Sequence, residues 1–397
     1  LKIEYIFLSL KNYISVVTSA LVEITELDVV NRYILKNCLN NHDSINETSI
    51  KRIQAVIDYM YEQVNIGNWK EVKVHLRKTI TIATFLKLLA SLKCSDETSE
   101  DSDRELFKTI DFGILFGCPL ETEPQLLQKC ADVLKPISDM YLDLPEASVS
   151  LEAENVKQEA ATIALEVLDC PSLEYFFKNH VAPKKPVVLS NCINHWPALT
   201  KWKDQNYFIQ LAGLRTVPVE LGKDYTDSKW SQKLMTIEEF VKGHIYETDG
   251  TTGYLAQYQL FDQIPELKKD IAEPDYCSFS DTDDPVDIMA WYGPKGTVSP
   301  LHHDPKKNLL AQVVGQKQIY LFSPSDTEHL YAHTHELLNN TARVDPRNPD
   351  YEKFPKYKDA KPYSCVLSAG QMLYIPPKWW HFVESLSVSF SVSFWWE

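Results

Sequence analysis

The feature that most restricts the fold of this chain is a series of short strand-like runs that fills the sequence after residue 287. The runs cover residues 308–314, 316–322, 365–367, 372–375 and 385–396, and apolar and polar residues alternate along several of them. Because side chains two apart on a strand share a face, such alternation indicates strands with one buried face. Many short strands at this spacing predict a sandwich or a barrel.

Shorter strand-like runs already begin near residue 171. They cover residues 186–189, 217–220, 254–260 and 287–292. Turns and a few short helices separate them. The clearest helix is expected at residues 236–244, with Thr236 as its N-cap, because a threonine side chain accepts a hydrogen bond from the first helical turn.

The first 150 residues have a different pattern. Apolar residues recur at three- and four-residue spacing in residues 3–39, 51–64, 79–92 and 124–142, which predicts helices. The serine-rich acidic residues 95–105 and the stretch 145–159 are interpreted as exposed linkers. We therefore expect an α+β chain, with an α-helical, partner-binding region at 1–150, a linker at 151–170 and a β-rich domain at 171–397.

Composition narrows the class of partner. The 397 residues carry 40 basic and 55 acidic side chains, a formal charge of -15, and such a surface repels nucleic-acid phosphate. A basic protein or peptide is the expected partner of a monomeric chain. No apolar run is long enough for a membrane span, and the eight cysteines are dispersed without a C-x-x-C pair, which is typical of an intracellular protein. The sequence opens at Leu1 rather than at methionine and leaves open whether a targeting segment precedes it.

Two histidines and a carboxylate occur close together in residues 299–304, which read SPLHHD. If this segment is a strand, His302 and Asp304 share a face and His303 points to the other side. His381, ahead of the run 385–396, supplies a third candidate ligand. Two histidines and one carboxylate that leave three adjacent coordination positions open are typical of non-haem Fe(II) oxygenases. His333 and His335 form a rival pair, but their polar surroundings favour an exposed loop.

A possible anion site lies on the strand that follows Gly315. Lys317, Ile319 and Leu321 share one face of it, and a lysine among inward apolar residues is costly unless an anion satisfies its charge. The alternative register buries Gln316, Gln318 and Tyr320 instead and is less apolar. On the preceding run, Asn308 shares a face with Leu310 and is placed to add a hydrogen bond beside the metal.

Four segments together resemble the jumonji-C (JmjC) family of 2-oxoglutarate oxygenases: residues 297–305 (TVSPLHHDP), 312–317 (QVVGQK), 378–381 (KWWH) and 389–396 (SFSVSFWW). The resemblance runs from about residue 170 to the end of the chain. It implies a double-stranded β-helix of the jelly-roll, cupin-like kind, with Fe(II), 2-oxoglutarate and O₂ as cofactors. Iron would be held by His302, Asp304 and His381.

The resemblance also implies that 2-oxoglutarate is bound by Lys317, Asn308, Ser299 and Tyr254, with Trp395 lining the site. His303 departs from the family, which often has glutamine there, and places a titratable group beside the metal. The other aromatic residues near His381 form either a dry wall of the site or ordinary core, namely Trp379, Trp380, Phe382 and Trp396.

The family resemblance leaves three activities open: arginyl C3-hydroxylation, histone lysine demethylation, and peptidase cleavage of methylated histone tails. The residues favour arginine, because Glu220 could bind a guanidinium with two hydrogen bonds and Trp230 could stack on it. Glu220 is equally compatible with a solvated strand residue. A non-catalytic, metal-binding chromatin scaffold and a zinc hydrolase are alternatives of other classes. The resemblance implies a nuclear location, with the cytoplasm as the second option.

Overall fold

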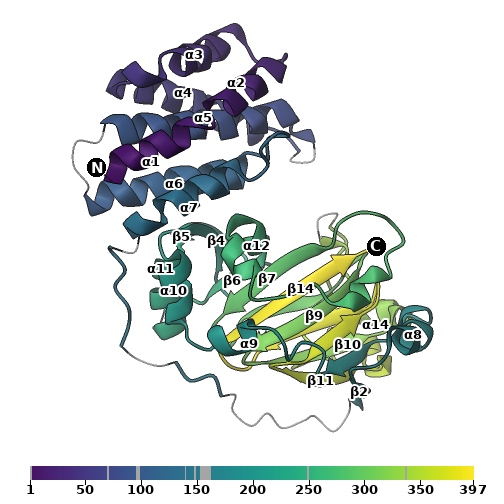
Figure 1. Cartoon of the computed structure of the whole chain (residues 1–397). Helices are drawn as coiled ribbons and strands as arrows, with labels where there is room; N and C mark the ends of the chain where they lie inside the picture. The colour runs from purple at the N-terminus through teal and green to yellow at the C-terminus, as the bar shows by residue number, and fades with distance from the viewer. Residues whose placement is uncertain are drawn as a thin grey trace. The chain divides into compact units, whose positions relative to one another are not determined.

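The computed structural model describes residues 2–68, 71–94, 99–138, 140–146, 149–152, 162–247, 250–335 and 338–397. The chain divides into two compact units. The first contains Leu1–Asp143 and the short segment Ala212–Thr216, and the second contains Leu144–Leu211 and Val217–Glu397. The first unit is helical and the second is rich in strands (Figure 1). The predicted fold class is therefore confirmed.

The helical unit is built around one buried helix. Its helices are α1 (Lys2–Lys11), α2 (Ile14–Glu23), α3 (Val29–Asn40), α4 (Glu47–Val64), α5 (Val74–Cys94), α6 (Glu100–Phe116) and α7 (Leu126–Ser138). Residues 79–86 of α5 are buried without interruption. A helix that is buried on every side belongs in the centre of a unit. Accordingly, α4, α6, α1 and α2 all contact α5.

The interpretation of residues 95–105 as a linker is wrong from Ser99 onward. Residues 95–98 lie outside the described part of the chain, but Glu100 begins α6. The Ser99 side chain accepts a hydrogen bond from the Ser102 backbone N–H, and the Ser102 hydroxyl oxygen accepts one from the Ser99 backbone N–H. Three acidic residues in the first turn also interact favourably with the positive end of the helix dipole. The acidic run is therefore the beginning of a helix.

Two sheets form the second unit. One is five-stranded, with β1 (Ile163–Ala164), β11 (Tyr363–Ser368), β10 (Gln316–Phe322), β13 (Trp380–Ser385) and β8 (Val298–His303) in that order. The other is nine-stranded and runs β2 (Val167–Asp169), β3 (Val187–Ser190), β12 (Met372–Ile375), β9 (Lys307–Val314), β14 (Ser389–Trp396), β7 (Asp287–Gly293), β6 (Gly253–Tyr258), β4 (Thr216–Leu221) and β5 (Ser231–Thr236).

Short helices accompany the strands of this unit: α8 (Leu173–Phe176), α9 (Ala198–Lys201), α10 (Asn206–Ala212), α11 (Ile237–Phe240), α12 (Leu260–Gln263), α13 (Pro265–Lys268) and α14 (Thr327–Leu330). The Thr236 side chain caps α11 as expected, accepting a hydrogen bond from the Glu239 backbone N–H. The helical conformation continues into a π-helical turn, Val241–Tyr246.

The core of the second unit lies between the two sheets. Ile319, Leu321 and Val383 come from the five-stranded sheet, and Leu310 and Leu373 come from the nine-stranded one, and all five belong to one buried cluster. The inward faces of both sheets therefore pack against each other, as in a jelly roll. This arrangement brings side chains from strands far apart in the sequence to the same interior.

The predicted single strand over residues 385–396 is divided between two strands, and Gly315 lies against the break. The chain leaves β13 at Ser385 and enters β14 at Ser389, which carries it from one sheet to the other. At Gly315, between β9 and β10, the chain also passes from one sheet to the other. Gly315 has a φ of +72°, and a Cβ atom there would lie 2.0 Å from the Val388 carbonyl oxygen. The two crossings touch, and only glycine fits between them.

The segment 151–170, predicted as a linker, ends in two short strands. Residues 163–164 form β1, which pairs in parallel with β11, and residues 167–169 form β2, which pairs in parallel with β3. Residues 149–152 have no regular secondary structure.

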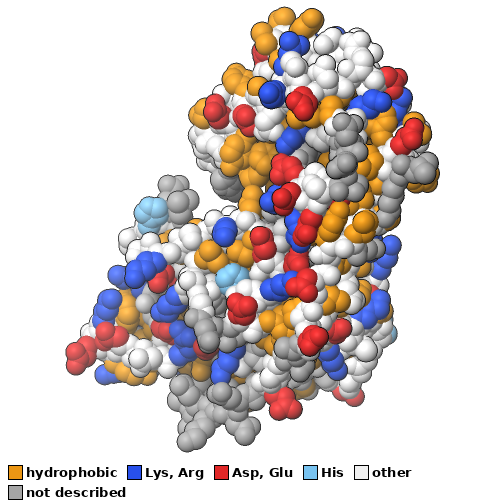
Figure 2. All heavy atoms as spheres, turned by 90° about the vertical axis from the view of Figure 1, so that its left-hand side faces the viewer, with side chains coloured by type: hydrophobic (Ala, Val, Ile, Leu, Met, Phe, Trp, Pro, Cys, Tyr) orange, Lys and Arg blue, Asp and Glu red, His pale blue; other side chains and the backbone are white. Residues whose placement is uncertain are grey.

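Among the described helices, none is by itself long and apolar enough to cross a membrane; one pair bent by 44°, Ile3–Lys11 with Ile14–Glu23, reaches that length and composition only jointly. On the face drawn in Figure 2, acidic and basic side chains are interspersed.

Candidate active site

Two histidines from neighbouring strands face each other on the five-stranded sheet. His302 on β8 and His381 on β13 are direct partners in the antiparallel ladder. Side chains of such a pair project to the same face of the sheet. The centres of the two imidazole rings lie 4.2 Å apart.

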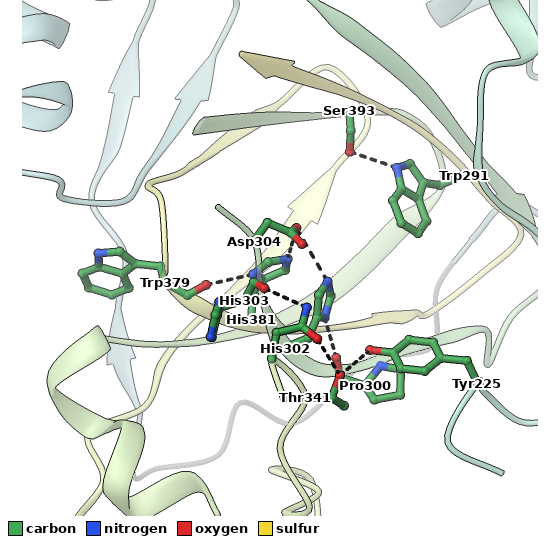
Figure 3. A network of polar contacts seen from close by, with 11 residues as sticks. Tyr225, Trp291, Pro300, His302, His303, Asp304, Thr341, Trp379, His381 and Ser393 are labelled. Atoms are coloured by element: carbon green, nitrogen blue, oxygen red, sulfur yellow. Dashed lines mark hydrogen bonds and ion pairs between the residues drawn. The ribbon is translucent and has the colours of Figure 1, made fainter. Parts of the chain in front are cut away.

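Asp304 joins the two histidines just beyond the end of β8. Its Oδ2 atom lies 3.7 Å from His302 Nε2 and 3.5 Å from His381 Nε2 (Figure 3). The candidate ligand atoms all lie within 4.8 Å of one another, and no other trio of His, Cys, Asp or Glu in the described ranges meets this criterion. The rival pair, His333 and His335, belongs to no such trio.

Backbone carbonyls fix the orientation of both imidazoles. His302 Nδ1 lies 2.7 Å from the Pro300 carbonyl oxygen, and His381 Nδ1 lies 3.0 Å from that of Trp379. A carbonyl oxygen only accepts, so Nδ1 must carry the proton and donate it. The lone pair of each Nε2 then points toward Asp304, which is the arrangement that a metal ion requires.

The protonation states of the trio also suit a cation. Burial, and then the neighbouring His381, lower the pKa of His302 to about 4. Burial opposes ionisation of Asp304, but the adjacent His381 and His302 outweigh it and hold the pKa of this carboxyl well below its usual value. At neutral pH the trio therefore offers a neutral His302 and a carboxylate.

His303 lies on the opposite face of β8, as strand alternation predicts. It pairs with Trp380 across the ladder, and the two rings meet edge to face with centres 4.6 Å apart. Burial, and then the charge of Lys378, lower the pKa of His303.

Lys317 reaches the same interior from β10. In the ladder with β13, Lys317, Ile319 and Leu321 lie opposite Ser385, Val383 and His381, respectively. The Lys317 side chain is 1% exposed, and its Nζ donates a hydrogen bond to Tyr254 Oη at 3.1 Å. Burial lowers the pKa of Lys317 to about 7. No carboxylate in the described part of the chain forms an ion pair with it.

The nine-stranded sheet supplies the opposite wall. Asn308 on β9 pairs with Trp395 on β14, and Leu310 pairs with Ser393 two residues further along. Trp291 on β7 donates its indole N–H to Ser393 Oγ at 2.9 Å (Figure 3). Tyr254 on β6 lies near Ser299 of β8 in the same interior.

One pocket is lined by the metal trio, by Lys317 and by side chains of the nine-stranded sheet. Its volume, including the part that is open to solvent, is about 340 Å³. Every residue predicted to bind metal or 2-oxoglutarate lines it, namely His302, Asp304, His381, Tyr254, Ser299, Asn308, Lys317 and Trp395. Five further residues line the pocket without having been predicted to belong to it: Trp291, Leu310, Ile375, Val383 and Ser393. Of these, only Leu310 had a sequence signal, its shared face with Asn308.

Comparison with known proteins agrees with this geometry. A family described as cupin-like domain matches residues 173–397. The chain is 42% identical over 361 residues to Lysine-specific demethylase 8 of Danio rerio, covering 88% of this chain and 87% of that protein. It is 40% identical over 390 residues to Jumonji C domain-containing protein 5 of Drosophila melanogaster, covering 93% and 94%. It is 38% identical over 395 residues to Lysine-specific demethylase 8 of Xenopus tropicalis, covering 86% and 87%.

This chain belongs to the JmjC family of 2-oxoglutarate-dependent oxygenases.

JmjC domains generally depend on Fe(II) and 2-oxoglutarate, and the pocket fits both groups. Three buried polar atoms that line it have no hydrogen-bond partner: Asp304 Oδ2, Asn308 Oδ1 and Trp395 Nε1. Such atoms cost free energy unless a bound group satisfies them. Two imidazoles and one carboxylate are the donor set of non-haem iron, and the buried Lys317 ammonium matches a carboxylate of the cosubstrate.

Most of the aromatic residues near His381 do not line the JmjC pocket. Trp380 and Phe382 belong to a separate buried cluster, Trp396 donates its indole N–H to the Phe279 carbonyl, and Trp379 donates to that of Lys184. The interpretation of these four as core is therefore the correct one. Trp291 and Trp395 are the tryptophans that line the pocket.

Glu220 and Trp230 lie beside the pocket rather than in its lining. Glu220 on β4 pairs with Tyr254 on β6, so both side chains project to the same face of the sheet. The Glu220 Oε2 atom accepts a hydrogen bond from Trp230 Nε1 at 3.2 Å. Trp230 thus acts as a hydrogen-bond donor to Glu220, a contact that the sequence did not predict. Burial raises the pKa of Glu220.

Tyr225 lies near the metal trio of this JmjC site without lining the pocket, and no sequence pattern pointed to it. Its hydroxyl lies 3.4 Å from Thr341 Oγ1 (Figure 3). Burial, and then the charges of Asp304, Asp224 and Glu220, raise the pKa of Tyr225 to about 12. The phenol therefore stays protonated within the field of both the metal trio and Glu220. A tyrosine in a loop carries no sequence signal that distinguishes it from other surface tyrosines.

Proposed function

We propose that this chain is a protein arginyl C3-hydroxylase that uses Fe(II) and 2-oxoglutarate. His302, Asp304 and His381 would hold the metal, leaving three adjacent positions for cosubstrate and oxygen. The bound cofactors supply the oxidative chemistry, in which 2-oxoglutarate and O₂ give succinate and CO₂ while one substrate C–H becomes C–OH. The task of the protein is then to bind, orient and exclude water.

The 2-oxoglutarate carboxylate that is distal to the metal would lie against Lys317. The ammonium is buried, and its partner in the structure is the neutral phenol of Tyr254. A carboxylate would supply the missing counter-charge and accept from both groups. Asn308 and Ser299 line the same pocket and offer further hydrogen bonds, and Trp395 contributes an apolar wall.

Glu220 carries the proposal that the substrate is arginine. Its carboxylate is half-buried, faces the same side as the pocket residue Tyr254, and forms no ion pair with a cation in the described part of the chain. Removing a carboxylate even partly from water without a cation beside it costs free energy, and its one side-chain partner in the described ranges is the Trp230 indole N–H. A guanidinium satisfies both carboxylate oxygens with parallel hydrogen bonds, which a lysine ammonium cannot do.

The charge of the whole chain agrees with a basic substrate. A formal charge of -15 favours the approach of arginine-rich protein segments. The partner is therefore proposed to be a basic protein or peptide rather than a nucleic acid. A nuclear location, with the cytoplasm as the second option, is proposed from the family resemblance alone.

The test compares arginine, lysine and methyl-lysine versions of one peptide. Wild type and Glu220→Gln would be incubated with Fe(II), 2-oxoglutarate and oxygen, and hydroxylated peptide and formaldehyde would be measured together. We expect hydroxylation of the arginine peptide only, with a loss of at least tenfold in Glu220→Gln, since breaking one charge-assisted bidentate contact costs about 1.5–3 kcal/mol.

The matched control is Glu174→Gln, which makes the same change at an exposed glutamate on α8. It should leave hydroxylation unchanged. Unaltered affinity of Glu220→Gln for 2-oxoglutarate would confirm that the cosubstrate site is separate. Hydroxylation of arginine that does not respond to Glu220→Gln would refute the role of Glu220.

Lysine demethylation is the second candidate, because two similar proteins, from Danio rerio and Xenopus tropicalis, are named lysine-specific demethylases. A demethylase would release formaldehyde from the methyl-lysine peptide. Formaldehyde without hydroxylated arginine, and without sensitivity to Glu220→Gln, would favour this activity over the proposed one.

A further inference from the structure

Two cysteines lie side by side where parallel strands β2 and β3 end. Asp169 of β2 is in register with Ser190 of β3, so Cys170 and Cys192 follow just beyond the paired residues. The Cys170 backbone N–H and the Cys192 thiol both donate to the Ser190 carbonyl oxygen, at 3.0 and 3.3 Å. These backbone contacts bring the two residues next to each other at the ends of neighbouring strands.

The two thiols are near enough to influence each other electrostatically, and both act on the Tyr276 hydroxyl. Tyr276 Oη lies 3.7 Å from Cys192 Sγ and donates to the Pro171 carbonyl at 2.6 Å. Cys170 has a φ of +38°, a left-handed conformation that a residue with a side chain seldom adopts. The backbone is thus held in an uncommon conformation at the position where the thiols meet.

The two thiols differ in exposure, and this difference indicates which one an oxidant reaches first. All eight cysteines lie in the described part of the chain, and Cys170 is the exposed one. Cys192 is half-buried, and burial raises its pKa to about 11. An oxidant from solution therefore meets Cys170 first, while Cys192 waits beside it as the second thiol.

We infer that Cys170 and Cys192 are a redox modification site that forms a reversible disulfide with hydrogen peroxide. In the first step the Cys170 sulfur is oxidised to a sulfenic acid, and peroxide is reduced to one water. In the second step the Cys192 sulfur attacks the sulfenic sulfur, the S–S bond forms, and hydroxide leaves with the Cys192 proton as a second water. Two electrons pass from the two thiols to peroxide, and a dithiol reductant reverses the change.

The test is peptide mapping of the full chain after limited peroxide treatment and blocking with N-ethylmaleimide. Trypsin cleaves at Lys178 and Lys184, which lie between the two cysteines, so a disulfide appears as two linked peptides. Their mass should be ~2 Da below the sum of the reduced peptides, and dithiothreitol should separate them. Cys170→Ser and Cys192→Ser should each abolish the linked species.

Cys118→Ser, at a half-buried cysteine of the helical unit, is the matched control and should not affect the cross-link. In Cys192→Ser the sulfenic acid at Cys170 should persist and be trapped by dimedone, whereas wild type should give little dimedone adduct. If both cysteines of peroxide-treated wild type still react with N-ethylmaleimide, the inference is overturned. It is also overturned if Cys170 proceeds to sulfonic acid as fast in wild type as in Cys192→Ser.

Discussion

The substitution Lys317→Met tests how much the lysine charge contributes to binding at the proposed cosubstrate site. Methionine is unbranched like lysine and fills a similar volume, so the 1% exposed position stays packed while the ammonium is removed. The hydrogen bond of 3.1 Å to Tyr254 Oη is lost with it. We expect 2-oxoglutarate to bind far more weakly, because its distal carboxylate would be buried without a counter-charge.

The size of the effect follows from the burial of this pair. Removing one partner of a buried, hydrogen-bonded charge pair costs roughly 2–5 kcal/mol. At about 1.4 kcal/mol for each factor of ten, the dissociation constant should rise between about 30-fold and about 4,000-fold. Tyr254→Phe removes only a neutral hydrogen bond worth about 0.5–1.5 kcal/mol, so it should weaken binding by about tenfold or less.

Binding should also depend on pH in a defined direction. In the free protein, burial lowers the pKa of Lys317 from 10.5 to about 7, and a bound carboxylate favours the charged form and raises it again. Above pH 7, 2-oxoglutarate binding therefore takes up a proton, and affinity falls as the pH rises. The free folded state gains stability between pH 7 and 10.5, because there the unfolded chain holds a proton that Lys317 has released.

The measurement is anaerobic titration calorimetry of metal-loaded protein in buffers with different ionisation enthalpies, which reports affinity and proton uptake together. Metal content, measured separately, should be the same in wild type and Lys317→Met. An affinity for 2-oxoglutarate within about threefold of wild type, or proton uptake that persists in Lys317→Met, would refute the assignment.

Two other predictions concern the metal and the fold. His302→Ala and Asp304→Ala should each lose bound iron and activity, whereas His303→Ala should retain iron because its ring faces Trp380; loss of metal in His303→Ala but not in His302→Ala would contradict the strand register. Gly315→Ala should lower the unfolding free energy by at least about 3 kcal/mol, since it adds a steric clash to a positive φ, whereas Gly296→Ala, with φ +86° and open space around its Cβ position, should cost only about 1 kcal/mol. Equal losses in urea unfolding of the two glycine variants would show that the clash is relieved at no cost.

Strand alternation was sufficient to predict which side chains share a face. His302 and Asp304 come together while His303 points away, and Lys317 is buried with its apolar neighbours. These positions follow from the alternation of side chains along one extended segment, which the backbone fixes at a period of two residues. The sequence therefore predicted them without knowledge of the partner strands.

Contacts between side chains on different strands could not be predicted from alternation. Trp291 and Ser393 meet because β7 pairs with β14, and Glu220 adjoins Tyr254 because β4 pairs with β6. Such registers depend on crossings like that at Gly315, which are visible only once both sheets are formed. The crossing that divides residues 385–396 was missed for the same reason, because alternation continues on either side of it.

Tyr254 contacts the buried cation of Lys317 and lies across the ladder from the half-buried carboxylate of Glu220. Its hydroxyl accepts from Lys317, while Glu220 lies opposite it in the ladder, and burial together with the Glu220 charge raises its pKa, so the phenol stays neutral. If Lys317 and Glu220 paired directly, each would neutralise the other and neither would attract a ligand. On the proposed assignment, separation by a neutral phenol leaves Lys317 for the carboxylate of 2-oxoglutarate and Glu220 for the guanidinium of the substrate.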